Sequence, residues 1–379
     1  NGWSLADVQW AFTLFVLFQT WVQPLDGWLI DRLGPRRFIT LAGVLSGAGW
    51  AALASASSLP QLYLFYATAG IGAALVYSGC IGSALKWFSD RRGLASGIIA
   101  AGFGGGTALF IPVIRYLIDV HGYRTAFLWT GIFQGVVIVL VAQFLSHPPK
   151  DLAAAKVTAA KPGANRRNTE HFTTGEMLRT RHFYLLYVMF VMMSTGGLLA
   201  TAQAGPVAQA FGLPLAALTA ALTLSPIANG ASRIFWGWVS DKLGREKTMA
   251  IAFFLQALCL LSVLTLGRRS GTWFMITLAL TFFTWGEIYS LFPSTSADWF
   301  GTRHATSNYA FLYTAKGVAS ILAGGAAAVL FEQFGSWSAA FYGSAVLAFV
   351  AGLMAVGVRL MPLPKKMLDA AATPVAAVN

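Results

Sequence analysis

Residues 27–37 read GWLIDRLGPRR, and residues 237–247 read GWVSDKLGREK. The two segments match at a spacing of 210 residues, and each follows a long apolar run and enters a short polar break. An internal repeat of this length indicates a duplicated helical bundle. The shared pattern G-x-x-x-D-[RK]-x-G therefore predicts a chain built from two related halves.

Apolar runs separated by short polar breaks fill most of the chain. Of the 379 residues, 56% are hydrophobic and only 11% are charged, and the mean hydropathy is +0.64. Soluble proteins carry about 25% charged residues, so this composition argues against a cytosolic enzyme, a DNA-binding protein and a disordered regulator. Since a membrane span takes about 20 residues, we expect eleven spanning helices, at 4–30, 38–56, 60–87, 93–118, 124–146, 183–210, 214–240, 248–267, 272–299, 302–331 and 336–360.

One long polar stretch divides these runs. Residues 147–182 hold seven Lys or Arg and no apolar run, which is typical of a linker. We predict a first bundle over 1–146, the linker over 147–182, a six-helix bundle over 183–360 and a tail over 361–379. The repeated motif follows the second of six spans in the second half but the first of five in the first half. We therefore expect one further span ahead of Asn1, making twelve.

The basic residues alternate along the chain. The polar breaks between spans fall alternately on two sides of the membrane. One side holds twenty of the 26 Lys and Arg, and the other side holds only Arg115, Arg124, Arg268 and Arg269. By the positive-inside rule the basic set faces the cytoplasm. We expect a multi-pass protein of the cytoplasmic membrane with a cytoplasmic C-terminus. Topology then accounts for the net charge of +12, and we expect no nucleic-acid partner.

Six plus six spans with this loop motif in each half resemble the major facilitator superfamily. The resemblance implies an all-helical fold of two six-helix bundles, with the substrate site between them near the middle of the membrane. Four motif residues are expected to form a gate at the cytoplasmic ends. In that gate each aspartate would cap a neighbouring helix or pair with arginines. The four gate residues are Asp31, Arg36, Asp241 and Arg245.

Two basic residues lie inside spans, where a charge at the membrane centre costs about 3 kcal/mol or more. Arg233 lies about two turns from the cytoplasmic end of its span, and its planar guanidinium suits a carboxylate; the alternative is snorkelling to the surface. Lys316 lies near mid-span with Tyr309 and Tyr313 on its helical face. Its alternative role is a structural ion pair with Glu287.

Glu287 is the third ionisable residue within a span. Its neighbours Trp285 and Tyr289 share one helical face, which we expect to line the transport path. Glu287 points elsewhere, and we interpret it as a charge partner or a packing acid, with proton coupling as the alternative. Two buried cations against one acid leave a positive centre that a small anion would neutralise. The substrate is therefore expected to be a small anion.

Four segments together resemble the oxalate/formate antiporters: 92–97 (RGLASG), 229–241 (NGASRIFWGWVSD), 285–293 (WGEIYSLFP) and 313–317 (YTAKG). The resemblance implies that Arg233 and Lys316 bind the two carboxylates of oxalate inside an aromatic cage. Candidates for that cage are Tyr77, Trp285, Tyr289 and Tyr313. For Tyr77, ordinary helix packing is the alternative.

We predict a secondary transporter that exchanges small carboxylates of the oxalate/formate type by alternating access. The main alternative is proton-coupled symport of lactate or pyruvate, with Glu287 as the titrating group, and a lesser one is a transporter-like anion sensor. The glycine run 102–106 lacks the Gly-Lys-Ser ending of a phosphate loop and indicates close helix packing or a flexible gate. We expect no enzyme activity, cofactor or metal, and a monomer whose partners are carboxylate anions and the bilayer.

Overall fold

The computed structural model describes residues 11, 14–15, 17–149, 165–323 and 327–366, without the side chains at 26–28, 31–32, 107–108 and 328–329. In this part of the chain every regular element is a helix. The first half holds α2 (Gln23–Leu33), α3 (Pro35–Ala52), η1 (Leu53–Ser55), α4 (Leu59–Trp87) and α5 (Arg92–Ala142). The second half holds α7 (Thr174–Leu178), α8 (Arg181–Ala210), α9 (Leu215–Leu243), α10 (Arg245–Thr265), η2 (Gly267–Arg269), α11 (Gly271–Trp285), α12 (Ile288–Phe300), α13 (Ala305–Ile321), α14 (Ala327–Phe334) and α15 (Ser338–Leu360).

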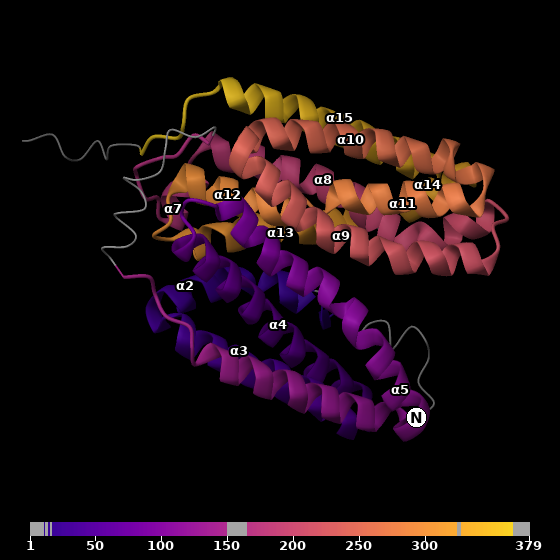
Figure 1. Cartoon of the computed structure of the whole chain (residues 1–379), viewed down its shortest axis with the longest axis horizontal. Helices are drawn as coiled ribbons and strands as arrows, with labels where there is room; N and C mark the ends of the chain where they lie inside the picture. The colour runs from indigo at the N-terminus through magenta and orange to yellow at the C-terminus, as the bar shows by residue number, and fades with distance from the viewer. Residues whose placement is uncertain (1–10, 12–13, 16, 150–164, 324–326, 367–379) are drawn as a thin grey trace, which may run out of the picture.

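The helices form two bundles that lie side by side (Figure 1). In the first bundle α3 packs against both α4 and α5, and in the second α10 packs on α15 and α13 on α8. Two pairs of helices join the bundles, because α5 runs along α9 and α2 runs along α13. The expected all-helical membrane fold is confirmed.

Eight helical stretches of the described chain are long and apolar enough to cross a membrane. One of them, α5, has 51 residues, which at 1.5 Å per residue is about 75 Å, more than twice the thickness of the hydrocarbon core. Its backbone leaves helical geometry at Gly122, with φ 81° and ψ 162°. The spans expected at 93–118 and 124–146 are therefore two helices joined at Gly122 without a loop between them.

The repeated motif joins consecutive helices by a single residue in each half. Gly34 connects α2 to α3 with φ 77°, and Gly244 connects α9 to α10 with φ 100°. Side chains other than that of glycine are disfavoured at such angles. The position of the glycine in both copies of the motif thus has a backbone cause. The polar breaks expected there are each reduced to a one-residue connection, Gly34 or Gly244.

The span expected at 272–299 is interrupted at Gly286 and Glu287, where α11 ends and α12 begins. The hydrogen-bond ladder tightens there, since the Ser290 N–H donates to the Glu287 carbonyl at 2.9 Å. The span expected at 302–331 is divided into α13 and α14 around residues 324–326, which lie outside the described chain.

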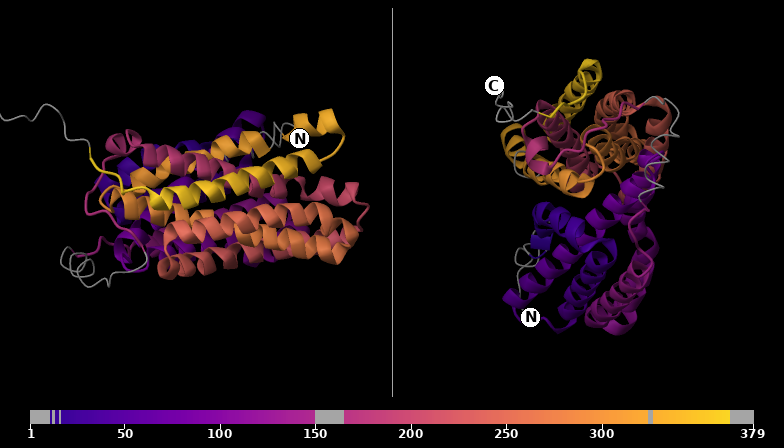
Figure 2. Two further views of the ribbon diagram at one scale, coloured as in Figure 1. Left: turned by 90° about the horizontal axis from the view of Figure 1, so that it is seen from above. Right: turned by 90° about the vertical axis from the view of Figure 1, so that its left-hand side faces the viewer.

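The bundles meet most closely at one end, which we call the linker end because residues 165–180 and 361–366 lie there. The view along the helices in Figure 2 shows the two groups as separate layers, and Figure 1 shows them approaching at the linker end and diverging at the other. One close approach is between Gly93 of α5 and Gly237 of α9. A Cβ on Gly93 would lie 2.3 Å from the Gly237 carbonyl oxygen, so only glycine permits this packing.

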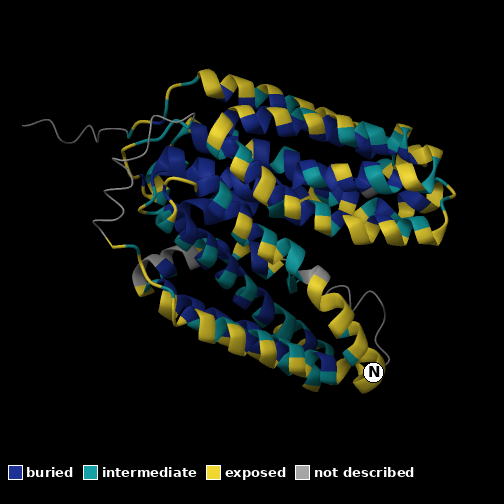
Figure 3. Cartoon of the chain, viewed as in Figure 1, coloured by how far each residue is buried: buried dark blue, intermediate teal, exposed yellow. Residues whose placement is uncertain are grey.

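Burial is deepest in the second bundle near the linker end (Figure 3). All thirteen residues of α12 are buried, because this helix contacts α5 and α4 of the first bundle as well as α8, α9, α10 and α13 of its own. The sequence of α12 includes several polar residues. These side chains are therefore held inside the protein, where they can form the site described below.

Candidate functional site

Arg233 lies in the interior of α9 with 6% of its surface exposed. Its Nε and Nη2 donate to the Oδ1 of Asn229, one turn earlier, at 3.1 and 2.7 Å, and its Nη1 donates to the Ala100 carbonyl of α5 at 2.6 Å. Arg233 therefore does not snorkel to the surface. Its guanidinium links the second bundle to the backbone of the first.

The glycine run in α5 makes room for this guanidinium. A Cβ on Gly104 would lie 2.6 Å from the Arg233 Cζ, closer than any side chain can approach. The glycine run 102–106, which does not carry phosphate-loop chemistry, thus receives an arginine from the other bundle at Gly104. The sequence interpretation of close packing accounts for this part of the run.

Arg233 and Lys316 face the same aromatic ring. The Arg233 Cζ lies 4.1 Å from the centroid of the Tyr289 ring, and the Lys316 Nζ lies 5.7 Å from the same centroid. Lys316 also donates to the Tyr313 hydroxyl at 3.2 Å. Two residues that are 83 positions apart in the sequence are therefore brought to one place by α9, α12 and α13.

Further aromatic side chains surround the two cations, and they come from both bundles. The Tyr77 ring of α4 lies 5.5 Å from the Tyr313 ring of α13, and the Tyr289 ring lies 6.3 Å from Tyr313 and 5.7 Å from Trp285. All four rings are buried. The indole Nε1 of Trp285 is buried without a hydrogen-bond partner among the described residues, so it is an available donor.

The partners of the two cations are neutral. Carbonyl and amide oxygens, a phenol and aromatic rings contact them, and no ion pair to either is formed within the described chain. Two positive charges in an apolar interior without a counter-charge are unfavourable. The arrangement can therefore hold a small anion, with a guanidinium at one side and an ammonium at the other.

Glu287 is not paired with either cation. It is fully buried, and neither carboxylate oxygen has a hydrogen-bond partner among the described residues. The reason is its direction, because Glu287 lies two residues from both Trp285 and Tyr289, which turn toward the cations. Its neighbour Gly286 packs against α9, where a Cβ would lie 2.0 Å from the Ser232 Oγ. The ion pair with Lys316, which the sequence left as an alternative, is not formed between these described residues.

Asn229 is a residue that the sequence analysis did not assign to the site, although it opens the segment NGASR. It accepts from Arg233 twice, and its Nδ2 donates to the Phe282 carbonyl of α11 at 3.1 Å. Asn229 thus fixes the direction of the guanidinium. An amide four residues before an in-span arginine, on the same helical face, was the available signal.

We expect Asn229→Leu to weaken binding of a carboxylate about 10- to 100-fold, because each hydrogen bond to a charged group contributes about 1.5–3 kcal/mol. Isothermal titration of the purified protein with oxalate measures this. The matched control is Gln134→Leu, also an amide-to-leucine change, at a position of α5 remote from the cations. Equal affinities for Asn229→Leu and the control would contradict the positioning role.

A second group of charged side chains lies at the linker end. Both oxygens of Asp241 accept hydrogen bonds from the first turn of α5, from the Gly93 N–H at 3.0 Å and the Leu94 N–H at 2.8 Å. Arg245 forms an ion pair with Asp241 at 2.8 Å. An aspartate at a helix N-terminus satisfies free N–H groups and the helix dipole, so Asp241 holds the two bundles together.

Asp298 completes this group, and the sequence analysis missed it. It is fully buried at the end of α12 and forms ion pairs with Arg92 of the first bundle, with Arg245 at 2.9 Å and with Arg167 of the linker segment at 3.5 Å. An acid within the last turn of an apolar run was the signal. We call Arg92, Asp241, Arg245 and Asp298 the linker-end latch.

The other half of the repeated motif behaves differently. Arg36 is exposed and donates to the Oε1 of Gln143 at 3.0 Å, which lies within its own bundle. Among the described residues, no hydrogen bond or ion pair joins its side chain to the second bundle. The side chain of Asp31 lies outside the described residues, so its expected role in the gate stays a prediction.

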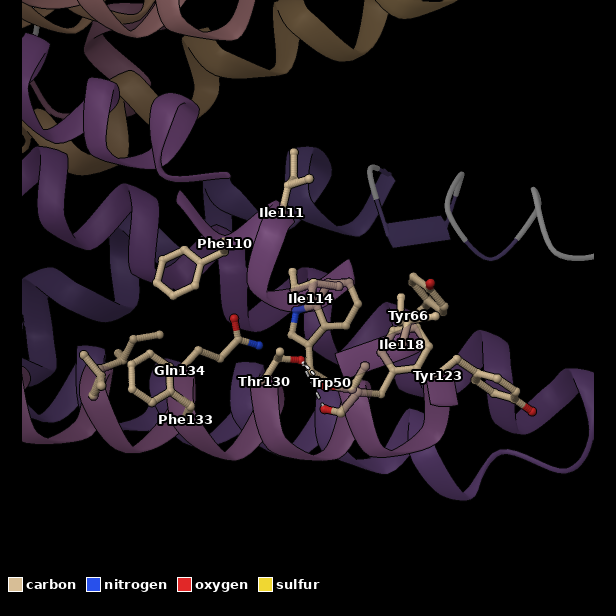
Figure 4. A pocket seen from close by; sticks show the side chains of 14 residues that line it. Trp50, Tyr66, Phe110, Ile111, Ile114, Ile118, Tyr123, Thr130, Phe133 and Gln134 are labelled. Atoms are coloured by element: carbon tan, nitrogen blue, oxygen red, sulfur yellow. Dashed lines mark hydrogen bonds between the residues drawn. The ribbon is translucent and has the colours of Figure 1, made fainter. Parts of the chain in front are cut away.

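A large apolar cavity lies away from the cations. It has a volume of about 640 Å³ and is enclosed by α3, α4 and both parts of α5 in the first bundle (Figure 4). Its lining is almost wholly apolar and aromatic, with Trp50, Tyr66 and Phe127 stacked or edge-on to one another. No charged side chain lines it, so it suits an anion less well than the group around Arg233 and Lys316 does.

Comparison with known proteins agrees with this architecture. The profile of the Major Facilitator Superfamily matches residues 1–202 and 184–376. The chain belongs to this superfamily. The profile thus matches the chain twice, over two segments that overlap at residues 184–202.

Individual members give more detail. The oxalate:formate antiporter of Oxalobacter formigenes is 39% identical over 354 residues, which cover 93% of this chain and 82% of that protein. Mouse monocarboxylate transporter 11 is 28% identical over 249 residues, covering 63% of this chain and 52% of its own length. The structure of the human organic anion transporter MFSD10 superposes with a TM-score of 0.73 at 15% identity, over 92% of this chain and 83% of that one. This major facilitator chain thus resembles transporters in both sequence and fold.

Proposed function

We propose that this protein exchanges small organic carboxylates across a membrane, with Arg233 and Lys316 as the two charges that hold the substrate. The observation that carries the proposal is that both cations contact the Tyr289 ring and that no described carboxylate neutralises either of them. The oxalate:formate antiporter relative supports a dicarboxylate as one partner of the exchange. We assign a transport activity and no enzymatic one.

The proposed mechanism follows from the cost of burying charge. When the site around Arg233 and Lys316 closes without an anion, the two cations lose water and gain no counter-charge, which opposes the conformational change. A bound carboxylate accepts from both and removes that barrier. The empty protein then reorients slowly and the loaded protein quickly, so that each crossing requires an anion and the net result is exchange.

The aromatic residues have a defined part in this proposal. Tyr77, Trp285, Tyr289 and Tyr313 exclude water around a planar anion, and their edges and the Trp285 N–H are electropositive. The site is closed only when both bundles meet, because Tyr77 belongs to the first and the other three to the second. We further propose that the linker end faces the cytoplasm, in agreement with its basic loops, and that the protein works as a monomer.

A second candidate function is proton-coupled symport of a monocarboxylate. Glu287 favours it, because it is a buried carboxyl group that no cation of the described chain neutralises, and such a group can bind and release a proton during transport. The monocarboxylate transporter relatives point the same way.

Uptake into liposomes separates the two functions. We expect radiolabelled oxalate uptake by the reconstituted protein to require internal oxalate or formate and to be unchanged by an imposed proton gradient. We also expect Glu287→Gln to exchange at the wild-type rate, because the exchange step moves no proton. Uptake that needs the gradient, prefers lactate or pyruvate and is lost in Glu287→Gln would establish the symporter instead.

A further inference from the structure

Another cavity, which is polar, lies at the linker end of the second bundle, outside the path between the bundles. Its volume is about 630 Å³, and it is lined by the ends of α7, α8 and the segment after α15. Four basic side chains face it, against one acidic side chain: Arg179, Arg181, Lys365, Lys366 and Glu176. It thus carries a marked excess of positive charge.

The walls of this cavity are held in place by specific contacts. A capping box forms between Thr173 and Glu176. The pKa of the Glu176 carboxyl is lowered, chiefly because the Thr173 N–H donates a hydrogen bond to it. Glu176 also pairs with Lys366 at 3.1 Å, which fastens the segment after α15 to α7. His182, at the start of α8, contacts the Pro362 carbonyl at 2.8 Å. The cavity is therefore built by two chain segments that lie almost 190 residues apart.

Three of its cations have no partner within the described chain. Arg179, Arg181 and Lys365 are exposed and form neither an ion pair nor a side-chain hydrogen bond there, whereas Lys366 is held by Glu176. Three free cations around one hollow attract an anionic group, and guanidinium groups bind phosphate oxygens by parallel hydrogen bonds.

The surface next to the cavity is apolar. Leu360, the last residue of α15, is 84% exposed, and Tyr184, in the first turn of α8, is 57% exposed. Further along α15 the exposed positions continue as Val356, Leu353 and Phe349, a spacing that places them on one helical face. The stripe ends at Leu360, just before the segment 362–366 that lines the cavity, and α8 and α15 pack together, so the apolar stripe begins beside the basic cavity at the ends of two membrane-spanning helices.

We propose that this cavity binds the phosphate headgroup of an anionic phospholipid, whose acyl chains lie along the apolar stripe of α15. Basic pockets at the ends of membrane helices suit such headgroups. The apolar stripe is what favours a lipid over a soluble phosphate, because a free anion gains nothing from it. Bound lipid would tie the tail segment to α8 and so brace the linker end of the second bundle.

Native mass spectrometry of the detergent-purified protein tests this with a mixture of phosphatidylglycerol and phosphatidylcholine. We expect phosphatidylglycerol to be retained preferentially, and the double variant R179Q/R181Q to retain it about 30-fold less, the factor that two basic contacts to an anionic lipid supply. Lys365→Gln, outside the helices, should give about a 5-fold loss. The matched control is R268Q/R269Q, the same change of two exposed arginines at the opposite end of the second bundle.

Three outcomes would overturn the proposal. One is retention by R179Q/R181Q equal to the wild type, and another is an equal loss in R268Q/R269Q, which would indicate unspecific charge attraction. The third is displacement of the lipid by glycerol 3-phosphate alone, which would make a soluble phosphate the ligand. Thermal unfolding of each variant shows that it is folded, and Lys365→Gln repeats the test without altering a helix.

Discussion

Replacing either cation of the candidate site, as Arg233→Gln or Lys316→Gln, is expected to abolish oxalate exchange and to weaken oxalate binding about 150- to 5,000-fold. Removing one partner of a buried charge contact costs about 3–5 kcal/mol, because the carboxylate would then enter the site without its counter-charge. Radiolabelled oxalate exchange in liposomes and titration of the purified protein measure the two quantities.

Conservative variants sharpen this result. Arg233→Lys should restore little, because an ammonium group cannot replace the planar guanidinium that Asn229 and the Ala100 carbonyl hold. Arg268→Gln, at the exposed far end of the second bundle, is the control for loss of a positive charge. If Lys316→Ala exchanged oxalate at a normal rate and with normal affinity, the two-cation site would be wrong.

Asp298→Asn is expected to open the linker end. The change leaves Arg92 and Arg245, which are 6% and 1% exposed, buried without their shared counter-charge, and this costs about 3–5 kcal/mol. A cost of that size shifts a two-state equilibrium by about 150- to 5,000-fold. Spin labels at positions 37 and 247, exposed and equivalent in the two repeats, should move apart in a dipolar distance measurement.

A double-mutant comparison shows whether the latch itself is responsible. Arg92→Gln combined with Asp298→Asn should cost less than the sum of the single changes, because the two residues form an ion pair. Asp119→Asn is the matched control, since that aspartate is exposed and, within the described chain, forms its ion pair with its helical neighbour Arg115. An unchanged distance distribution in Asp298→Asn, with the protein folded, would contradict the latch.

The latch also shows that the two halves of the repeat are not equivalent. In the second half the motif residues Asp241 and Arg245 reach the first bundle directly or through Asp298. In the first half Arg36 stays within its own bundle. Residue 35 is a proline where the second half has Arg245, so the first copy lacks the guanidinium that an ion pair of this kind requires.

Much of the architecture follows from the sequence alone. Apolar runs of about 20 residues must become helices in a bilayer, because no water is present there to satisfy the backbone. The motif at 27–37 and 237–247 repeats once, so the bundle is duplicated. For the site, the sequence identified Arg233 and Lys316 because a charge within a span is costly and therefore seldom incidental, and it placed Trp285 and Tyr289 together on one helical face.

Only the tertiary structure decided which of these residues meet. Periodicity places a side chain on a face of its own helix but does not say which helix that face contacts. The contact of Arg233 and Lys316 with one tyrosine, the space that Gly104 leaves for a guanidinium and the turning of Glu287 away from both cations depend on packing between distant segments. Asp298 was missed for the same reason, since its three arginine partners lie 53 to more than 200 residues away in the chain.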